Sequence, residues 1–330
     1  MVEVPITIAC GNYDRTRPIM DGRVKVEGCG VTYLPLYPEE IFFRAFRYHE
    51  FDVCELSFSS YLRTVANGTS AYMGVPAFVS RIFRHSGIYV RRDAGIKTPA
   101  DLRGKRIGLP EYQITAVVWM RGMLQHEYGV TPAEIRWRSG GQEQPGRDER
   151  TPLKPIPGLD LQAIGDRQTL VGMLRDGELD ALFTARPPSS FLRGEPHIGR
   201  LFPDTREAEM AYFRKTGLFP IMHLVGIRKT LLDRYPWLAT SVYKAFCEAK
   251  ALAMCDLRDV NALMVTLPFL EAEALATMAA MGDDFWRYGV HENKGEIEAL
   301  TGYAYEQGLV DRKLAPEELF APSVFEVSKV

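Results

Sequence analysis

The chain has 330 residues, of which 46% are hydrophobic and 25% charged, and its formal net charge is -2 at pH 7. This ordinary globular balance gives no general reason to expect nucleic acid or an anionic membrane as a partner. No run of about 18 apolar residues occurs, so the sequence predicts no membrane-spanning helix. The length is sufficient for two domains that each bury a core.

The N-terminal residues and the cysteines give an indication of the compartment. The start, MVEVPITIAC, lacks the basic region of a signal peptide, and Pro5 and Thr7 interrupt its apolar run, so we expect a first strand there. The five cysteines are an odd number without CxxC spacing, which favours reduced thiols over a disulfide framework. We therefore expect a cytoplasmic protein that does not serve a periplasmic transporter.

Strands are expected in the first 65 residues over 4–9, 31–36 and 52–56, and an amphipathic helix opens at Pro38. Polar side chains at the strand ends are candidates for ligand binding. They are Tyr13, Arg15, Arg17, Glu55, Ser57 and Ser59. A solvated loop is the alternative for the arginines, and helix capping is the alternative for the serines.

Residues 80–86, SRIFRHS, alternate polar and apolar side chains in the manner of a strand. This period places Arg81, Phe83 and His85 on one face and Ile82 and Arg84 on the other. Two basic side chains on one face are hard to reconcile with plain burial. The pattern therefore favours contact with a ligand. An exposed sheet face is the alternative.

The stretch 88–124 predicts a strand, a short helix, a second strand over 106–109 and a longer helix. The turn at the end of the second strand contains Tyr112, and the longer helix after it contains Thr115 and Trp119. Such a turn from a strand into a helix leaves N–H groups unpaired. It is therefore typical of an anion site.

The rest of the chain contains a long polar connection and helices that we interpret as scaffold. Residues 139–158 are rich in glycine, proline and charged residues, and they form either a flap over a ligand or a surface excursion. Strands are expected over 180–183 and 221–227, and Arg186 follows the first of these. The scaffold helices are expected over 236–254, 270–281 and 295–308.

Several motifs of the chain resemble the 4,5-dihydroxyphthalate decarboxylase family, soluble enzymes built on a binding-protein fold. They are YDRTR (13–17), FDVCELSFSSY (51–61), SRIFRHS (80–86), LPEYQITAVVWMRG (109–122), GELDAL (177–182), LFPD (201–204) and TGLFPIMH (216–223). SRIFRHS followed by LPEY and FPIMH is the most specific part. The resemblance implies an α/β, two-lobed type 2 periplasmic-binding-protein-like fold with a ligand cleft between the lobes.

The segments 88–93 and 221–227 look like the places where the chain crosses between the lobes. We therefore expect a discontinuous lobe I, residues 1–92 plus 226–330, and a lobe II of residues 93–225. Ligands of open α/β sheets bind beyond the carboxyl ends of the strands, so the polar strand ends would face the cleft. The expected substrate-binding residues are Tyr13, Arg15, Arg17, Ser57, Ser59, Arg81, Phe83, Arg84, Tyr112, Thr115, Trp119, Arg186 and Phe219.

The residue types in this set suit an aromatic dicarboxylate. A guanidinium group pairs with a carboxylate through two parallel hydrogen bonds, and the set contains several arginines. Phe83, Trp119 and Phe219 could hold an aromatic ring, although such residues are more often part of a core.

The resemblance implies non-oxidative decarboxylation of a hydroxylated aromatic dicarboxylate, with 4,5-dihydroxyphthalate converted to 3,4-dihydroxybenzoate (protocatechuate) and CO2. A general acid must deliver a proton to the carbon that loses CO2. His85 is the first candidate for this acid because an imidazole titrates near neutral pH, and His223 and Glu55 are the alternates. The competing hypothesis is a cytoplasmic solute-binding or sensor protein for a small aromatic acid or pyrimidine-like ligand, without catalysis.

The sequence lacks the common nucleotide, hydrolase and zinc motifs, since GxGxxG, GxxxxGK[ST], GxSxG, HExxH and CxxC are all missing. We expect no cofactor and no metal, although His85, His223 and Glu55 could meet in space and hold an ion. The expected partner is the small aromatic dicarboxylate, without nucleic acid or membrane, and a homo-oligomer is possible.

Overall fold

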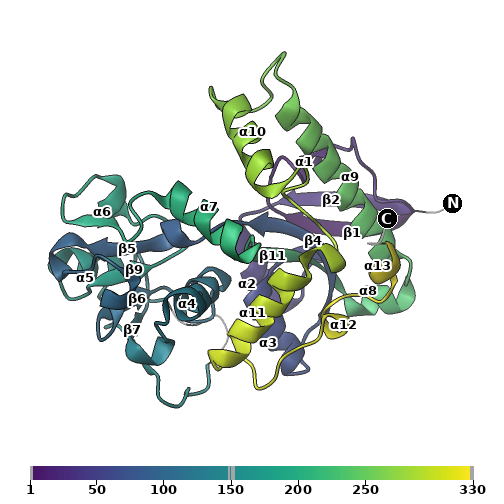
Figure 1. Cartoon of the computed structure of the whole chain (residues 1–330). Helices are drawn as coiled ribbons and strands as arrows, with labels where there is room; N and C mark the ends of the chain where they lie inside the picture. The colour runs from purple at the N-terminus through teal and green to yellow at the C-terminus, as the bar shows by residue number, and fades with distance from the viewer. Residues whose placement is uncertain (1–2, 148, 150–152, 328–330) are drawn as a thin grey trace. The chain divides into compact units, whose positions relative to one another are not determined.

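The computed structural model describes residues 3–147, 149 and 153–327. The chain divides into two compact units, each made of separate segments (Figure 1). Unit 1 comprises Met1–Arg81, Ile221–Ile297 and Leu314–Val330, and unit 2 comprises Ile82–Pro220 and Glu298–Lys313. No described helix is long and apolar enough to cross a membrane.

Unit 1 contains a sheet in the order β2-β1-β3-β11-β4. Its strands are β1 (Val4–Cys10), β2 (Cys29–Pro35), β3 (Val53–Ser57), β4 (Tyr72–Arg81) and β11 (Ile221–Arg228). β1 runs parallel to β2 and β3, whereas β11 runs antiparallel to β3 and β4. The carboxyl ends of β1 and β3 therefore lie at the same edge as the start of β11.

Amphipathic helices cover this sheet because crossovers between parallel strands need a connecting element. α2 (Pro38–Tyr48) joins β2 to β3, and α3 (Phe58–Ala66) joins β3 to β4. The core lies where these elements meet, and Ile8, Val53 and Leu224 have no exposed surface. The other helices of this unit are α1 (Arg17–Met20), α8 (Lys229–Arg234), α9 (Leu238–Arg258), α10 (Leu270–Met281), α12 (Pro316–Leu319) and α13 (Ser323–Val327).

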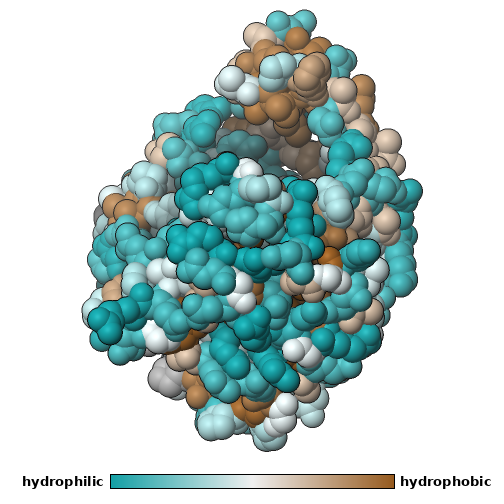
Figure 2. All heavy atoms as spheres, turned by 90° about the vertical axis from the view of Figure 1, so that its left-hand side faces the viewer, coloured by the Kyte–Doolittle hydropathy of each residue, from teal (hydrophilic) through white to brown (hydrophobic). Residues whose placement is uncertain are grey.

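The connection of residues 259–269 and the helix α10 form an arm with apolar side chains on its surface. These are Val260, Leu263, Met264, Leu267, Phe269 and Leu275, each at least 43% exposed. Figure 2 shows brown, hydrophobic atoms gathered at the top of the molecule, over this arm.

Unit 2 contains a sheet in the order β10-β5-β9-β6-β7-β8. Its strands are β5 (Ile88–Arg91), β6 (Arg106–Leu109), β7 (Arg136–Ser139), β8 (Asp160–Ala163), β9 (Ala181–Phe183) and β10 (Ile198–Arg200). β6, β7, β8 and β9 run parallel, and β5 pairs antiparallel with β9 and β10. The carboxyl ends of β6 and β9 therefore share one edge of this sheet.

Helices and short 3-10 turns complete the second unit. The helices are α4 (Thr115–Tyr128), α5 (Leu170–Asp176), α6 (Ser189–Leu192) and α7 (Thr205–Thr216), and α11 (Lys294–Glu306) extends from unit 1 into unit 2. Single 3-10 turns of this unit are found at His85–Gly87, Arg92–Ala94, Pro99–Leu102 and Pro132–Glu134, whereas the turn at His291–Asn293 belongs to unit 1. A buried cluster that includes Leu170, Leu174 and Leu182 packs α5 against the sheet.

The structure corrects the strand expected over 80–86. β4 ends at Arg81, and His85–Gly87 form a 3-10 turn before β5 begins. The alternation of polar and apolar residues is therefore not the period of a strand beyond Arg81. The N–H of Ile82 donates to the carbonyl of Pro220 in the other connecting segment. This bond takes the place of further strand pairing after Arg81.

The unit boundaries differ from the predicted lobe boundaries. Unit 1 ends at Arg81 and resumes at Ile221. The predicted lobe boundaries lie instead between residues 92 and 93 and between residues 225 and 226. β5 belongs to the second sheet through its pairing with β9, and the whole of β11 belongs to the first. Residues 298–313, which the prediction assigned to lobe I, are part of unit 2.

Candidate functional site

Glu55 is the centre of a polar cluster at the strand ends of unit 1. It lies in the middle of β3, all of whose residues are buried, and its side chain has no exposed surface. The Oε1 atom accepts from the Tyr13 hydroxyl at 2.9 Å and from Nδ1 of His223 at 2.6 Å. The Oε2 atom accepts from the N–H of Gly11 at 3.0 Å and from the Cys10 thiol at 3.5 Å. Four donors therefore share this carboxylate.

The sheet topology explains why these residues meet. Gly11 directly follows β1, and His223 pairs in register with Ser57 at the end of β3. The turn needs glycine at residue 11, since a Cβ there would lie 2.4 Å from Cζ of the Tyr13 ring. Tyr13 can therefore fold back over the turn and reach Glu55.

The hydrogen bonds decide the charge of Glu55. Burial by itself raises the pKa of a carboxyl group, but the hydrogen bond and charge of His223 oppose it. With the donors from Gly11 and Tyr13, they bring the pKa of Glu55 below its usual value. Glu55 is therefore ionised at neutral pH.

His223 is oriented by two neighbours. Its Nδ1 atom faces the carboxylate of Glu55, which can only accept, so this nitrogen carries the proton. The ring of Phe42 packs edge-on against the imidazole, with centroids 4.8 Å apart. The His223 side chain keeps 18% of its surface exposed, whereas Glu55 keeps none. Glu55 therefore fixes the ring of His223 through Nδ1, and any further contact of the ring falls to Nε2.

Tyr13 and Cys10 remain neutral donors to Glu55. Burial, together with the nearby negative charge of Glu55, raises the pKa of the Tyr13 hydroxyl well above its usual range. The same two causes raise the pKa of the Cys10 thiol. Both groups therefore keep their protons near neutral pH.

Arg15 places a positive charge beside this cluster. Its guanidinium lies 4.4 Å from the centroid of the Tyr13 ring and 4.1 Å from that of Trp286. Nε donates to the carbonyl of Val79, and Nη1 pairs with Asp14 at 3.0 Å. The side chain is 17% exposed, so the guanidinium is held firmly and still reaches the surface.

Arg17 and the serines lie near the same strand ends. Arg17 is exposed at the start of α1, and its Nε donates to Asn12. Ser57 occupies the N-cap position of α3 without a side-chain cap bond, and the Ser60 hydroxyl donates to it at 3.3 Å. Ser59 is completely buried in α3. Arg17 is therefore the most accessible cation of this group.

Arg81 is occupied by partners within unit 1. Its guanidinium pairs with Glu296 at 2.6 Å and donates to Asn293 at 2.6 Å, and only 1% of its side chain is exposed. Burial lowers the pKa of Arg81 to about 10, although Glu296 opposes that shift. This network ties the end of β4 to residues 287–296.

His85 lies in unit 2 among aromatic rings. The centroids of Phe202 and Tyr212 are 4.9 and 5.3 Å from that of its imidazole. Neither ring nitrogen has a hydrogen-bond partner in the described part of the chain, and burial lowers the pKa of His85 to about 4. His85 is therefore a neutral imidazole near neutral pH.

The neighbouring aromatic residues form a packed cluster. Phe83 contacts Phe219 at 4.8 Å between ring centroids, and Tyr212 and Phe213 pack edge-on against it. Arg84 lies nearby, and burial lowers its pKa to about 10 against the attraction of Glu209. The expected substrate residues Phe83 and Phe219 thus have protein neighbours on several sides.

The expected residues of α4 and of the β6–α4 turn are buried in unit 2. Tyr112 and Trp119 are at most 1% exposed, and Trp119 packs edge-on against Tyr303. Thr115 is the first residue of α4 and is also buried. Arg186 is exposed after β9, and its carbonyl accepts from Gln142.

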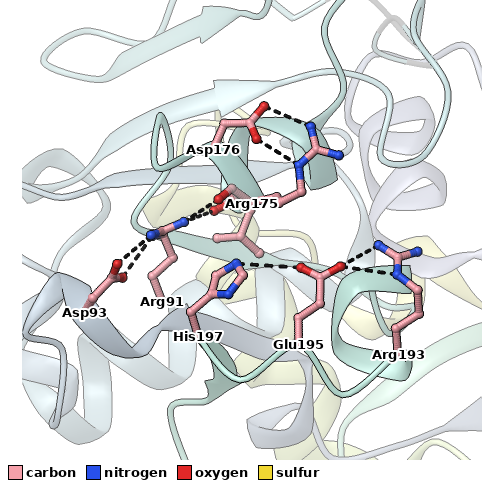
Figure 3. Close-up of polar contacts among 8 residues, drawn as sticks. Arg91, Asp93, Arg175, Asp176, Arg193, Glu195 and His197 are labelled. Atoms are coloured by element: carbon pink, nitrogen blue, oxygen red, sulfur yellow. Dashed lines mark hydrogen bonds and ion pairs between the residues drawn. The ribbon is translucent and has the colours of Figure 1, made fainter.

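Another polar cluster of unit 2 consists of balanced charges. Arg91 pairs with Asp93 and donates to the carbonyls of residues 174 and 175, while Arg175 pairs with Asp176 (Figure 3). Arg193 and His197 both approach Glu195. Each arginine here already faces a carboxylate, so the cluster has no excess charge to attract an anion.

Comparison with known proteins places the chain in a family. Residues 75–143 match the model of the family described as NMT1/THI5 like. The chain is 46% identical over all 330 residues to 4,5-dihydroxyphthalate decarboxylase of Comamonas testosteroni, and the match covers 100% of both chains. The chain belongs to the 4,5-dihydroxyphthalate decarboxylase family. This confirms the resemblance drawn from the motifs.

A second member of the 4,5-dihydroxyphthalate decarboxylase family, from Pseudomonas putida, is 46% identical over 65% of this chain and 83% of its own length. Among solved structures, a putative periplasmic sulfonate-binding protein SsuA of Methylobacillus flagellatus has a TM-score of 0.56 at 12% identity, covering 99% of this chain and 94% of that one. SsuA of Escherichia coli has a TM-score of 0.51 at 14% identity over 98% and 99%. The desulfurization enzyme DSZB has 0.51 at 13% identity over 99% of both.

These likenesses confirm the predicted fold class, an α/β fold of the type 2 periplasmic-binding-protein kind. For a member of the decarboxylase family, a cluster that can move a proton is the feature of interest. The sequence drew attention to Tyr13, Arg15, Glu55 and His223, which the structure brings together in unit 1.

Two aromatic residues of this cluster were not predicted from the sequence. Trp286 stacks on Arg15, and the hydroxyl of the buried Tyr288 has no hydrogen-bond partner among the described residues. Burial raises the pKa of Tyr288, and Arg15 and Cys10 act on it electrostatically. No spacing in the sequence signals either residue, since both lie more than 200 positions from Arg15.

No group of three or more His, Cys, Asp or Glu side chains that could hold a metal is found in the ranges that the structure describes. Part of the expected flap over 139–158 falls on residues 148 and 150–152, which lie outside the described residues. The described part of this connection packs on other residues of unit 2, because Gln142 hydrogen-bonds Thr184 and Glu143 accepts from Ser189.

Proposed function

We propose that this chain catalyses the non-oxidative decarboxylation of 4,5-dihydroxyphthalate to 3,4-dihydroxybenzoate and CO2. It would thus be a carboxy-lyase of phthalate degradation. The full-length likeness to a 4,5-dihydroxyphthalate decarboxylase supports the substrate. The pairing of Glu55 with His223 is the observation that carries the mechanism.

The reaction replaces a carboxylate by a proton on one ring carbon. The hydroxyl group para to that carbon pushes electrons into the ring, and the carbon accepts a proton from a general acid. The bond to the carboxylate then breaks, its electron pair restores the aromatic ring, and CO2 leaves. The acid has lost one proton, which it regains from water.

His223 is our candidate for the acid. A protonated imidazole carries N–H groups on both nitrogens, and Nδ1 is held by Glu55, which leaves Nε2 to deliver its proton. The ionised Glu55 accepts from Nδ1 and so holds the ring in place for the transfer. Gly11, Tyr13 and Cys10 support this role because they hold the carboxylate in place.

Arg15 is our candidate for holding the carboxylate that stays on the ring. Its guanidinium is fixed by the rings of Tyr13 and Trp286, and a fixed fork binds a carboxylate with little loss of side-chain entropy. Arg17 offers a second, more exposed cation. Asp14, which is 53% exposed, partly neutralises Arg15, and a substrate carboxylate can take the place of Asp14 beside the guanidinium.

The surroundings of His85 favour His223 over the first candidate from the sequence. Burial lowers the pKa of His85 to about 4, so its imidazole is neutral near neutral pH and has no imidazolium proton to donate. Among the described residues His85 also has no carboxylate partner, whereas His223 has Glu55. Its neighbours Phe202 and Tyr212 suit a structural role.

The decisive experiment measures release of CO2 and formation of 3,4-dihydroxybenzoate by the wild type and two variants. His223→Gln should lower kcat by about 10²–10⁴-fold, the usual contribution of a general acid, because glutamine cannot transfer the proton. His85→Gln should keep most of kcat. A collapse of kcat in His85→Gln with full activity in His223→Gln would return the acid role to His85.

The same experiment separates an enzyme from a binding protein. If the wild type gains thermal stability with 4,5-dihydroxyphthalate but releases no CO2, the chain is a binding or sensor protein. The cytoplasmic location and a homo-oligomer also stay proposals. Cell fractionation and light scattering of the pure protein would test them.

A further inference from the structure

Ser80 lies beside the proposed acid in the sheet of unit 1. β11 pairs antiparallel with β4 (Figure 1), and in this pairing Ser80 is the residue opposite His223. Side chains of opposite residues in antiparallel strands project from the same face of the sheet, with Cβ atoms about 4.5–5.5 Å apart. The Ser80 hydroxyl and the His223 imidazole therefore project side by side.

The strand pairing next to Ser80 is irregular. Five positions of β4, from Ser80 to Val75, lie opposite two positions of β11, from His223 to Val225. A bulge leaves its extra residues unpaired, and bulges are common next to active sites. The backbone of residues 76–79 is therefore available to partners other than β11.

Arg15 is one of these partners. Its Nε donates to the carbonyl of Val79, the residue directly before Ser80, at 2.8 Å. Because Nε is bound to the strand, the two Nη atoms remain for other contacts. Nη1 pairs with the exposed Asp14, and Nη2 has no hydrogen-bond partner in the ranges that the structure describes. Ser80 therefore adjoins both the proposed carboxylate anchor and the proposed acid.

The fold of unit 1 does not use the Ser80 hydroxyl. Ser80 is half-buried at the end of a strand that is otherwise almost completely buried. Its side chain forms no hydrogen bond with another described residue. Ser57, the residue opposite His223 on its other side, differs in this respect because its oxygen accepts from Ser60 at 3.3 Å. The Ser80 hydroxyl is therefore a donor that a ligand can use without breaking a bond of the protein.

We propose that Ser80 is a substrate-binding residue whose hydroxyl donates a hydrogen bond to the carboxylate held by Arg15. The ligand class, an aromatic dicarboxylate, and the role of Arg15 rest on the proposed function. The carboxylate that stays on the ring keeps its charge throughout the reaction. The hydrogen bond from Ser80 is therefore equally strong before and during proton transfer, so it contributes to affinity and leaves the rate of the bound substrate unchanged.

The experiment measures the dissociation constant of phthalate by calorimetry for the wild type, Ser80→Ala, Ser80→Thr and Ser241→Ala. Phthalate has both carboxylates but no hydroxyl group to drive decarboxylation, so binding is observed without turnover. Ser80→Ala should bind phthalate about 10–100-fold more weakly, the usual effect of losing a hydrogen bond to a charged group. Ser80→Thr keeps the hydroxyl and should bind like the wild type. Ser241→Ala, at a half-buried serine of α9, is the matched control and should also bind like the wild type.

Melting temperatures and kinetics with 4,5-dihydroxyphthalate separate binding from the other roles of a serine. Ser80→Ala should keep the wild-type melting temperature, raise KM and leave kcat nearly unchanged. Unchanged phthalate affinity in Ser80→Ala would overturn the proposal, as would a fall of kcat at unchanged KM, a loss of melting temperature in Ser80→Ala, or a wild type that does not bind phthalate. If the phthalate affinities follow the expectation but the wild type releases no CO2, the proposed function fails and the binding role of Ser80 stands.

Discussion

His85 and His223 show how the surroundings of a side chain decide what its ring can do. His85 lies among aromatic residues, and neither of its ring nitrogens has a hydrogen-bond partner in the part of the chain that the structure describes. Nδ1 of His223 donates to the ionised carboxylate of Glu55, which fixes the orientation of the ring. The same residue type is therefore a packing element in unit 2 and a candidate acid in unit 1.

The low pKa of His85 predicts a pH-dependent contribution to stability. The pKa is about 4 in the folded chain and about 6.5 in an unfolded one, so the unfolded chain binds the proton more readily. The contribution is fully present above pH 6.5 or so and is lost as the pH falls toward 4, with an upper limit of roughly 3 kcal/mol. His85→Gln should flatten the fall of melting temperature in this window. The exposed His291→Gln serves as control, and an equal fall in all three proteins would contradict the assignment.

Gly11 is the residue on which the position of Tyr13 depends. In Gly11→Ala the new Cβ would clash with the Tyr13 ring, which would move its hydroxyl away from Glu55. A hydrogen bond to a charged group contributes about 1.5–3 kcal/mol, so the melting temperature and kcat should both fall. Gly30→Ala in β2 is the matched control, since its Cβ would meet only the Glu3 side chain, at 3.4 Å. Full activity and stability in Gly11→Ala would show that Tyr13 does not support Glu55.

At the scale of elements, β4 and the first turn of α11 are joined by a buried ion pair. Arg81 ends β4, and Asn293 and Glu296 receive its guanidinium. A buried pair is costly to break, because the remaining charge loses its partner without gaining water. The first arginine of the SRIFRHS motif, Arg81, is therefore explained by the joining of two elements.

Arg81→Met should destabilise unit 1 by about 3–5 kcal/mol, the usual cost of removing one partner of a buried pair. Chemical denaturation would measure this loss. Arg17→Lys is the comparison at an exposed arginine, and it should leave stability unchanged while weakening binding of a diacid. If Arg81→Met instead kept its stability and lost only diacid binding, Arg81 would belong to the substrate site.

At the scale of the whole molecule, the chain passes from unit 1 to unit 2 and back more than once. β11 lies between β3 and β4 and pairs with both, so unit 1 has no continuous sheet without residues 221–228. A fragment of residues 1–220 should therefore fail to fold on its own. Circular dichroism and size exclusion would check this, and co-expression with residues 221–330 should restore a folded complex. A cooperative unfolding transition in the lone fragment would refute the expectation.

Features that depend on neighbouring residues, or on the family resemblance, could be predicted from the sequence. The strand over 106–109, the α4 helix and the fold class belong to these. The motifs raised the meeting of Glu55, His223 and His85, but not that Glu55 pairs with His223 alone, since 168 positions separate these two and the register of β3 and β11 brings them together. β8 and β10 were missed because each is a short edge strand with polar or glycine residues.

The central place of β11 also has a consequence for synthesis on the ribosome. About 160 residues must be added after Ser57 before Ile221 emerges, which takes roughly 8–30 seconds at the usual rate of translation. During this time the edge of β3 that β11 later covers has no strand beside it, and an unpaired edge can template aggregation. The nascent chain therefore depends on protection of that edge, so its yield in cells should respond to chaperone supply more strongly than its final stability suggests.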